Sequence, residues 1–236
     1  MDYPEVSILI PVYQRHEFLN LTLYNVKSQD YPHTKLRLII DECLSEKPFI
    51  NGPEEYRQIC DYLHPIPVIH NVYRERSTIG EKRNRLVKSA RTQYCQFFDS
   101  DDLYKSTAIS YNYKRLKDKS VKCVGSDKMI FCYTKNDFQM SGINCGNRIS
   151  HIHEATIFFN RKWFASTSKF ARNSKGEGAR LFEGLKSNVV AISDITKIMI
   201  CLVHDDNTVK KDIFKKNLTP MNEDVVVFLK GLLKGI

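Results

Sequence analysis

Residues 94–102 read YCQFFDSDD, an apolar and aromatic run that ends in three carboxylates. The run is typical of a buried strand, and because unpaired carboxylates are costly to bury, we expect the acids where the strand leaves the sheet. Asp99 and Asp101 share one side of an extended chain, and Asp102 joins them if the chain turns. These oxygen ligands suit a hard divalent ion that also binds substrate phosphates. Taken alone, the pattern is equally typical of a solvated acidic turn.

The chain before this stretch alternates predicted strands and helices. Residues 6–12, VSILIPV, predict a central buried strand because they are apolar and mostly β-branched. The other elements predicted here are helices at 17–29, 53–63 and 79–87 and strands at 36–40 and 65–70. This order predicts an α/β fold with a doubly wound, mostly parallel sheet, which binds ligands at the carboxyl ends of its strands. Tyr13, Asp41, Glu42 and the acids of residues 99–102 all follow such ends.

The second half of the chain is predicted to extend this sheet, so that residues 1–208 form a single domain. Its predicted elements are helices at 103–118 and 161–170, strands at 121–124, 128–133, 153–159, 189–192 and 197–203, and polar loops at 141–146 and 174–180. Residues 209–236 form a basic tail, and an apolar face within 222–236 predicts a helix. We expect that helix to dock on the domain, with attachment to a membrane or a partner as the alternative.

Composition limits the classes of function. The chain has 236 residues, 42% of them hydrophobic, which suits one large domain. A net charge of +9 favours anionic partners such as nucleotides, nucleic acid or an acidic membrane surface. Its seven scattered cysteines contain no C-x-x-C pair, which argues against metal fingers and a disulfide framework. No signal peptide or membrane-spanning run is visible, so we expect a cytoplasmic protein, soluble or peripheral.

Four stretches give the chain a recognisable pattern: VSILIPVY at 6–13, LIIDE at 38–42, GEKRN at 80–84 and DSDD at 99–102. In this order and spacing, the chain resembles family 2 glycosyltransferases with the GT-A fold, from residue 6 to about 208. The resemblance implies a hexosyltransferase that moves a sugar from a nucleoside diphosphate sugar to an acceptor hydroxyl, with inversion and a bound Mn²⁺ or Mg²⁺. Residues 1–103 would then bind the nucleotide sugar, and residues 104–208 would carry the acceptor and catalytic half.

The resemblance also implies which residues bind the donor. Asp41 or Glu42 would accept the imino proton of the base. Because the family usually has two aspartates there, the choice of carboxylate stays open, as does uracil against guanine, with UDP favoured. A glycine permits close backbone approach, and cations offset the charge of a diphosphate, although Lys and Arg clusters are more often solvated. The further donor contacts are Pro11, Val12, Tyr13 and Arg15, then Gly80, Lys82, Arg83 and Asn84 near the diphosphate, and Asp99 and Ser100.

The metal ligands and the general base follow from the same resemblance. Asp101 would be the principal ligand, helped by Asp99 and by His204, although a lone histidine is more often structural. Inversion needs a base that takes the acceptor proton. Glu177 in Gly-Glu-Gly matches the family's acidic motif best, with glycine where the second acid often stands, and Glu183 and Glu154 compete with it.

Two other classes of function compete with this interpretation. A sugar nucleotidyltransferase also uses an α/β fold and a divalent ion, but residues 11–16 lack the glycine-rich loop that we expect of it. A non-catalytic module that binds polyanions or nucleotides would explain the charge, but not an acidic cluster beside phosphates. We therefore expect a glycan, lipid or protein acceptor and no nucleic-acid partner, with peripheral membrane contact through the tail as an option.

Overall fold

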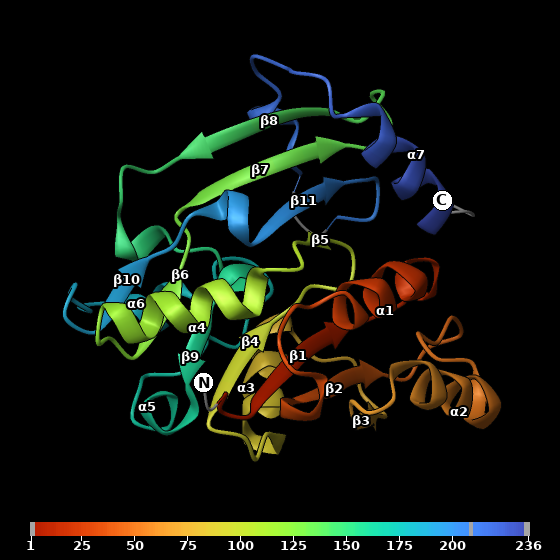
Figure 1. Cartoon of the computed structure of the whole chain (residues 1–236), viewed down its shortest axis with the longest axis horizontal. Helices are drawn as coiled ribbons and strands as arrows, with labels where there is room; N and C mark the ends of the chain where they lie inside the picture. Colours follow the sequence, from red (N-terminus) through yellow and green to blue (C-terminus); the bar gives the residue numbers. More distant parts are fainter. Residues whose placement is uncertain (1–2, 208–209, 234–236) are drawn as a thin grey trace.

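The computed structural model describes residues 3–207 and 210–233, so positions 208 and 209, at the predicted domain boundary, lie outside the described residues. A seven-stranded sheet crosses the molecule (Figure 1). Only β9 is antiparallel to its neighbours, which confirms the mixed, mostly parallel sheet. Its strands, in spatial order, are β10 (Val190–Ile192), β6 (Cys123–Gly125), β9 (Phe158–Asn160), β4 (Tyr94–Phe97), β1 (Val6–Val12), β2 (Leu36–Cys43) and β3 (Val68–Tyr73).

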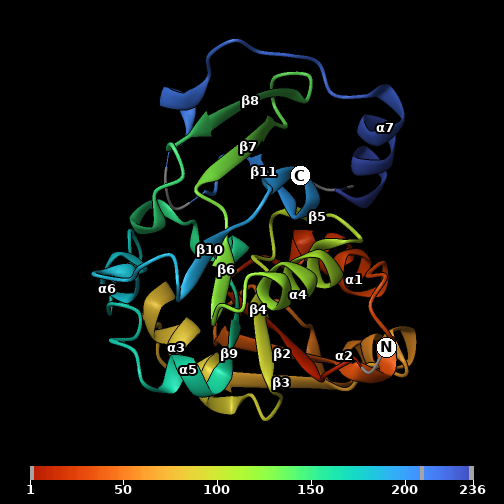
Figure 2. The same cartoon turned by 60° about the vertical axis from the view of Figure 1, so that its left-hand side comes forward.

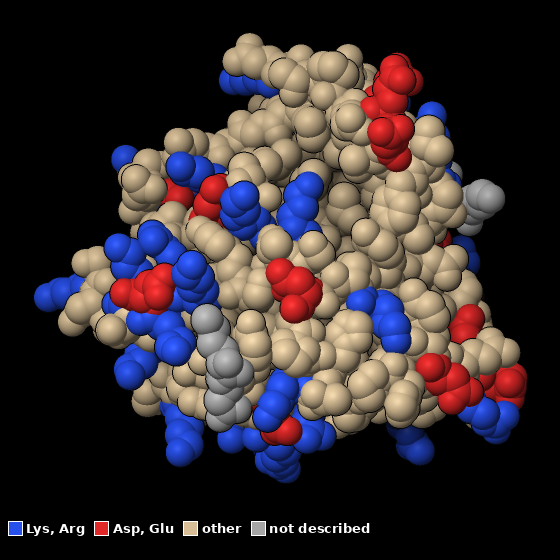
Figure 3. Space-filling view, viewed as in Figure 1, with Lys and Arg blue, Asp and Glu red and all other residues tan. Residues whose placement is uncertain are grey.

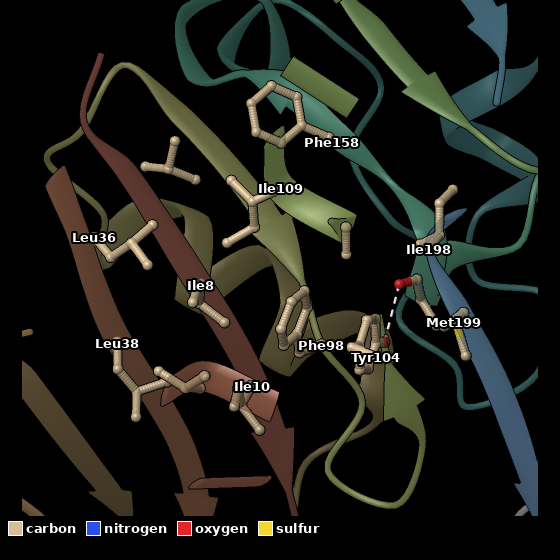
Figure 4. Packing of buried hydrophobic residues seen from close by; sticks show 14 of the residues in the cluster. Ile8, Ile10, Leu36, Leu38, Phe98, Tyr104, Ile109, Phe158, Ile198 and Met199 are labelled. Carbon is tan, nitrogen blue, oxygen red and sulfur yellow. Dashed lines mark hydrogen bonds between the residues drawn. The ribbon is translucent and has the colours of Figure 1, made fainter. Parts of the chain in front are cut away.

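Both faces of the sheet are buried, because alternate residues of each strand point to opposite sides. Ile8 and Ile10 pack in one cluster with helices α1 (Leu19–Lys27), α2 (Gly52–Leu63) and α4 (Ala108–Asp118). Leu9 packs in a second cluster with α3 (Ile79–Ser89), α5 (Arg161–Ala165) and α6 (Ala179–Phe182). Figure 4 shows the first cluster running from β2 and β1 to Phe98 and Tyr104, beyond the end of β4. The helices therefore flank the sheet on both sides, as the sequence predicts.

A second sheet lies above the carboxyl ends of the first in Figure 1 and is seen from another side in Figure 2. Its order is β5 (Leu103–Tyr104), β11 (Met199–Val203), β7 (Lys128–Tyr133) and β8 (Gln139–Asn144). The second half of the chain thus extends the first sheet through β6, β9 and β10, whereas β5, β7, β8 and β11 form a separate sheet, contrary to the expectation that they extend the first. Helix α7 (Glu223–Leu232) packs through Leu229 against this second sheet. No helix formed by the described part of the chain is long and apolar enough to cross a bilayer.

Three local predictions are wrong for reasons of tertiary pairing. The expected helix at 103–118 starts only at Ala108, because Leu103 and Tyr104 pair with β11. The polar residues 139–144 form β8 because β7 supplies a full ladder of antiparallel partners. The expected strand at 153–159 begins at Phe158, after a 3-10 turn, η4 (Glu154–Thr156).

Tyr104 joins the two sheets beside the acidic stretch. Its ring stacks on Phe98 with centroids 3.8 Å apart. Its hydroxyl accepts the backbone N–H of Asp99 at 2.8 Å and donates to the carbonyl of Ala155 at 3.0 Å. Burial raises the pKa of this hydroxyl well above its ordinary value, so it remains a donor. The turn after β4 is therefore fixed to η4 by a single buried side chain.

Candidate active site

A cavity of about 700 Å³ opens at the carboxyl ends of β1 and β4, between the two sheets. Its volume lies in the range of small-molecule sites, which is about 300–1,000 Å³. The predicted residues that line it are Pro11, Val12, Tyr13, Arg15, Lys82, Arg83, Asp99, Ser100, Asp101 and Glu177. The predicted residues outside its lining are Asp41, Glu42, Gly80, Asn84 and His204.

Tyr13 forms an aromatic wall at one end of the cavity. The guanidinium of Arg76, from the loop between β3 and α3, lies 4.4 Å from the ring centroid. The Nζ of Lys82 lies 5.9 Å from the same centroid and donates to the carbonyl of Val12. Burial lowers the pKa of Lys82. This end therefore offers a planar ring face with two cations beside it.

Arg83 links the acidic turn to the loop before α6. Its Nη2 donates to both carboxylate oxygens of Asp99, at 3.0 and 3.1 Å, and its Nε donates to Glu177 at 3.1 Å. Despite burial, which opposes the charge, Asp99 and Glu177 raise the pKa of Arg83 above its ordinary value. Its remaining amino group, Nη1, is buried without a hydrogen-bond partner among the described residues. Arg83 thus keeps one unused donor.

Asp101 and Asp102 are adjacent but have opposite environments. Burial raises the pKa of Asp101, but His204 at 3.1 Å and Arg15 at 3.5 Å outweigh it and lower the pKa to about 2. Burial and the charge of Asp101 raise the pKa of Asp102 to about 8, and its Oδ1 accepts the N–H of Leu202 at 3.0 Å. Asp101 is therefore the anion at neutral pH, and Asp102 is held in the wall.

The residues at this turn fit a divalent ion by donor type. Within residues 3–207 and 210–233, no group of three or more His, Cys, Asp or Glu is arranged to hold a metal. Asp99 and Asp101 nevertheless both face the cavity, with side chains 27% and 20% exposed, and His204 contacts Asp101. Asp101, which contacts His204 and Arg15 through Oδ2 alone, leaves Oδ1 for an ion, in line with the way Mg²⁺ binds through few protein ligands and substrate phosphates.

The two carboxylates at the end of β2 do not line the cavity. Asp41 receives two hydrogen bonds from Arg85, at 2.8 and 2.9 Å. Glu42 contacts the ring of His70 at 2.7 Å and accepts the N–H of Phe49. Both acids are 1% exposed. Their expected contact with the base stays a prediction.

Gly80 and Asn84 contact the loop at residues 170–173. A Cβ on Gly80 would lie 1.8 Å from the carbonyl oxygen of Ala171, so the close approach that requires glycine is to this chain's own backbone. The side-chain amide of Asn84 donates to the carbonyl of Phe170 at 3.0 Å and accepts its N–H at 3.1 Å. Both residues thus hold the start of the loop that carries Glu177.

The cavity is also lined by residues that the sequence did not single out, among them Arg76, His153 and Lys211. Arg76 lies in a polar link without periodic pattern, and His153 precedes η4. Lys211 comes from the tail, and its Nζ lies 2.7 Å from the sulfur of Cys201. The basic character of the tail is visible in the sequence, but the contact between residues 201 and 211 depends on how β11 and the tail pack.

A family comparison matches this region of the chain. The model described as Glycosyl transferase family 2 matches residues 7–175. The chain belongs to this family. Among named relatives, TuaG of Bacillus subtilis (strain 168), named for teichuronic acid biosynthesis, is 25% identical over 117 residues, which cover 50% of this chain and 44% of TuaG. The chain thus spans about half the length of such relatives.

Solved structures share the fold of this family 2 chain at low identity. The crystal structure of S. aureus TarS 1-349 in complex with UDP-GlcNAc is 14% identical, with a TM-score of 0.66, over 86% of this chain and 60% of that one. The mannosyltransferase PcManGT from Pyrobaculum calidifontis, in complex with GDP-Man and Mn²⁺, is 18% identical, with a TM-score of 0.64, over 91% and 59%. The expected GT-A fold is confirmed.

Proposed function

We propose that this chain transfers a sugar, with inversion, from a nucleoside diphosphate sugar to an acceptor hydroxyl, most simply on a glycan. The observation that carries the proposal is the cavity that brings together an aromatic wall, buried cations and the acidic turn. TarS and PcManGT, which share the fold, bind UDP-GlcNAc and GDP-Man. We favour a UDP-sugar as the donor. A glycan fits as the acceptor because it offers hydroxyl groups.

The donor end uses residues whose contacts are already described. Tyr13 offers an aromatic ring on which a nucleobase can stack, and the guanidinium of Arg76 already packs 4.4 Å from the centroid of that ring. The unused Nη1 of Arg83 can donate to the diphosphate, and such charge-assisted hydrogen bonds are strong. Mn²⁺ or Mg²⁺ held at Asp101 and Asp99 would offset the charge of the leaving nucleoside diphosphate. The Nε2 atom of His204 lies 3.1 Å from Oδ2 of Asp101 and helps to hold this carboxylate in place.

The acceptor end needs a group that takes the hydroxyl proton. The cavity wall beside Arg83 offers Glu177, the base that the sequence favours, and Glu154, its competitor. Glu183 is exposed and lies outside this cavity. The proposed function therefore rests on one of the first two carboxylates.

Thermal unfolding against nucleoside diphosphates and nucleotide sugars, each with and without Mn²⁺, tests this function. A ligand that binds only the folded state raises the melting temperature by mass action. The proposal predicts a rise that is selective for one base and larger with Mn²⁺. Stabilisation by heparin or polyphosphate alone, with no response to any nucleotide, would contradict it and favour a polyanion-binding module.

The charge distribution gives that module little support on the visible face. Figure 3 shows Lys and Arg gathered at the left and along the lower edge, and acidic side chains at the upper right near α7. On this face, and for the described residues, the two signs are mixed and form no continuous basic stripe. A transferase remains the better account of the cavity.

A further inference from the structure

The wall beside Arg83 holds a carboxylate where residue 178 has no side chain. A Cβ on Gly178 would lie 2.5 Å from Oε1 of Glu154 and 2.9 Å from its Cδ. The N–H of Gly178 donates to the same Oε1 at 2.8 Å. The backbone of Gly178 has φ −77° and ψ −17°, an ordinary conformation, so glycine is needed here for space and not for backbone freedom. Glu154 thus occupies the volume that a side chain at position 178 would take.

The turn that carries Glu154 is rigidly held against the acidic stretch. Its neighbour Ala155 accepts the hydroxyl of Tyr104, which also binds the N–H of Asp99. Thr156, 0% exposed, donates its hydroxyl to the carbonyl of His153 at 2.7 Å and accepts the N–H of Ser126 at 2.8 Å. Groups that act on a reacting atom need this kind of fixed support.

The two carboxylates of this wall differ in their partners. Glu177 is 5% exposed and forms a salt bridge with Arg83 at 3.1 Å. Within residues 3–207 and 210–233, each of the two uses only Oε1 in a hydrogen bond, but the donor to Glu154 is the neutral backbone N–H of Gly178. Glu177 is thus occupied in holding the buried guanidinium of Arg83, whereas Glu154 forms no salt bridge among the described residues and is held by a backbone N–H.

We propose that Glu154 is the general base of the transfer, and that Glu177 positions Arg83. The inference rests on the proposed function. The acceptor oxygen forms its bond to the anomeric carbon while the bond from that carbon to the diphosphate oxygen breaks. The electron pair leaves with the nucleoside diphosphate, and the acceptor proton passes to Oε2 of Glu154.

Moving the carboxylate from position 154 to position 178 tests this role. Turnover is followed as release of nucleoside diphosphate from UDP-GlcNAc or GDP-mannose with water as acceptor. Glu154→Ala is expected to reduce it about 100-fold or more, within the usual range for a general base. Because Glu154→Ala empties the space beside Gly178, the double variant Glu154→Ala/Gly178→Asp returns a carboxylate to it and is expected to recover at least about tenfold of that loss. Glu183→Gln, an exposed acid outside the cavity, is the matched control.

Azide separates a lost base from a damaged donor site. Azide carries no proton, so it attacks without a base and yields a glycosyl azide of inverted configuration and the nucleoside diphosphate. Glu154→Gln should bind UDP with Mn²⁺ as the wild type does, by thermal shift, and regain turnover with azide. Glu177→Gln should instead bind donor more weakly, seen as a higher KM, and gain nothing from azide.

The outcomes separate this inference from the proposed function. Full turnover by Glu154→Gln, or azide rescue of Glu177→Gln in its place, would overturn the role of Glu154 and leave the transferase intact. Donor binding without turnover by the wild type would also overturn it and leave the donor site. A wild type that neither binds nor turns over any nucleotide sugar would remove both.

Discussion

The ends of β2 and β4 carry the same kind of sequence, but their acidic side chains have different surroundings. Each is an apolar strand that ends in acids at the same edge of the sheet. At β2, Arg85 and His70 bind Asp41 and Glu42, and neither acid lines the cavity. At β4, the acids line the cavity, and Asp101 stays partly exposed.

The hydrogen-bond partners of the acids, and not the acids alone, therefore decide which strand end becomes a site. Arg85 forms a bidentate pair with Asp41, which uses both of its oxygens. Asp101 contacts His204 and Arg15 through one oxygen, Oδ2, and its other oxygen has no hydrogen-bond partner among the described residues. Only the second arrangement leaves a charged acceptor for a ligand.

Asp101→Asn removes the charge of the acid that follows β4 and lines the cavity. We expect it to reduce turnover more than the other substitutions in this section. Loss of the anion should remove the Mn²⁺-dependent stabilisation by UDP. Since a bound metal contributes several kcal/mol to charge stabilisation, turnover should fall about 100-fold or more. Thermal shift and release of nucleoside diphosphate measure the two effects. Asp205→Asn, whose side chain is 71% exposed, is the control, and equal losses in both variants would contradict a specific role of Asp101.

Asp41→Asn removes the charge of a buried acid at the end of β2 and should lower the stability of the fold. Arg85 would lose its bidentate partner, which we expect to cost about 1–3 kcal/mol in the free energy of unfolding. Urea denaturation measures that loss. Glu5→Gln, which breaks the exposed pair with Arg37, should cost about 0–1 kcal/mol. A change in the preference between UDP and GDP, with stability intact, would show instead that Asp41 reads the base.

Tyr13→Ala removes the aromatic wall of the cavity and tests whether the nucleobase stacks there. Stacking of a base on an aromatic ring is worth about 1–3 kcal/mol, so the affinity for the nucleoside diphosphate should fall about tenfold. Calorimetric titration with UDP measures the change. Tyr62→Ala, at an exposed ring on α2, is the matched control. Unchanged affinity in Tyr13→Ala would place the nucleobase elsewhere in the cavity.

The smallest expected effect is a pH dependence at His153. Burial lowers the pKa of this imidazole to about 4, below its ordinary value of 6.5. Between these two pH values the imidazole binds a proton in the unfolded chain but not in the folded one. The contribution of His153 to the free energy of unfolding is therefore fully present above pH 6.5 and is lost as pH falls toward 4. His153→Gln should flatten the curve of melting temperature against pH in that window. An identical slope in the variant would exclude His153 as the cause.

The sequence alone is enough to predict the buried strands that become β1, β2 and β4 and the acidic turn that follows β4. The apolar runs that become β1, β2 and β4 are continuous, so their burial follows from local composition. Asp99 and Asp101 had to leave the sheet, since burying them unpaired is costly. The cavity at this edge follows from parallel strands and needs no knowledge of the loops.

The side chains that complete the site are known only from the folded structure. Arg76, Glu154 and Lys211 reach the cavity from three segments far apart in the sequence. The polar strand β8 forms because β7 offers it a ladder, and Gly178 is a glycine because Glu154 fills its space. Contacts of this kind depend on which surfaces meet after folding, and no local pattern of charge or hydrophobicity encodes them.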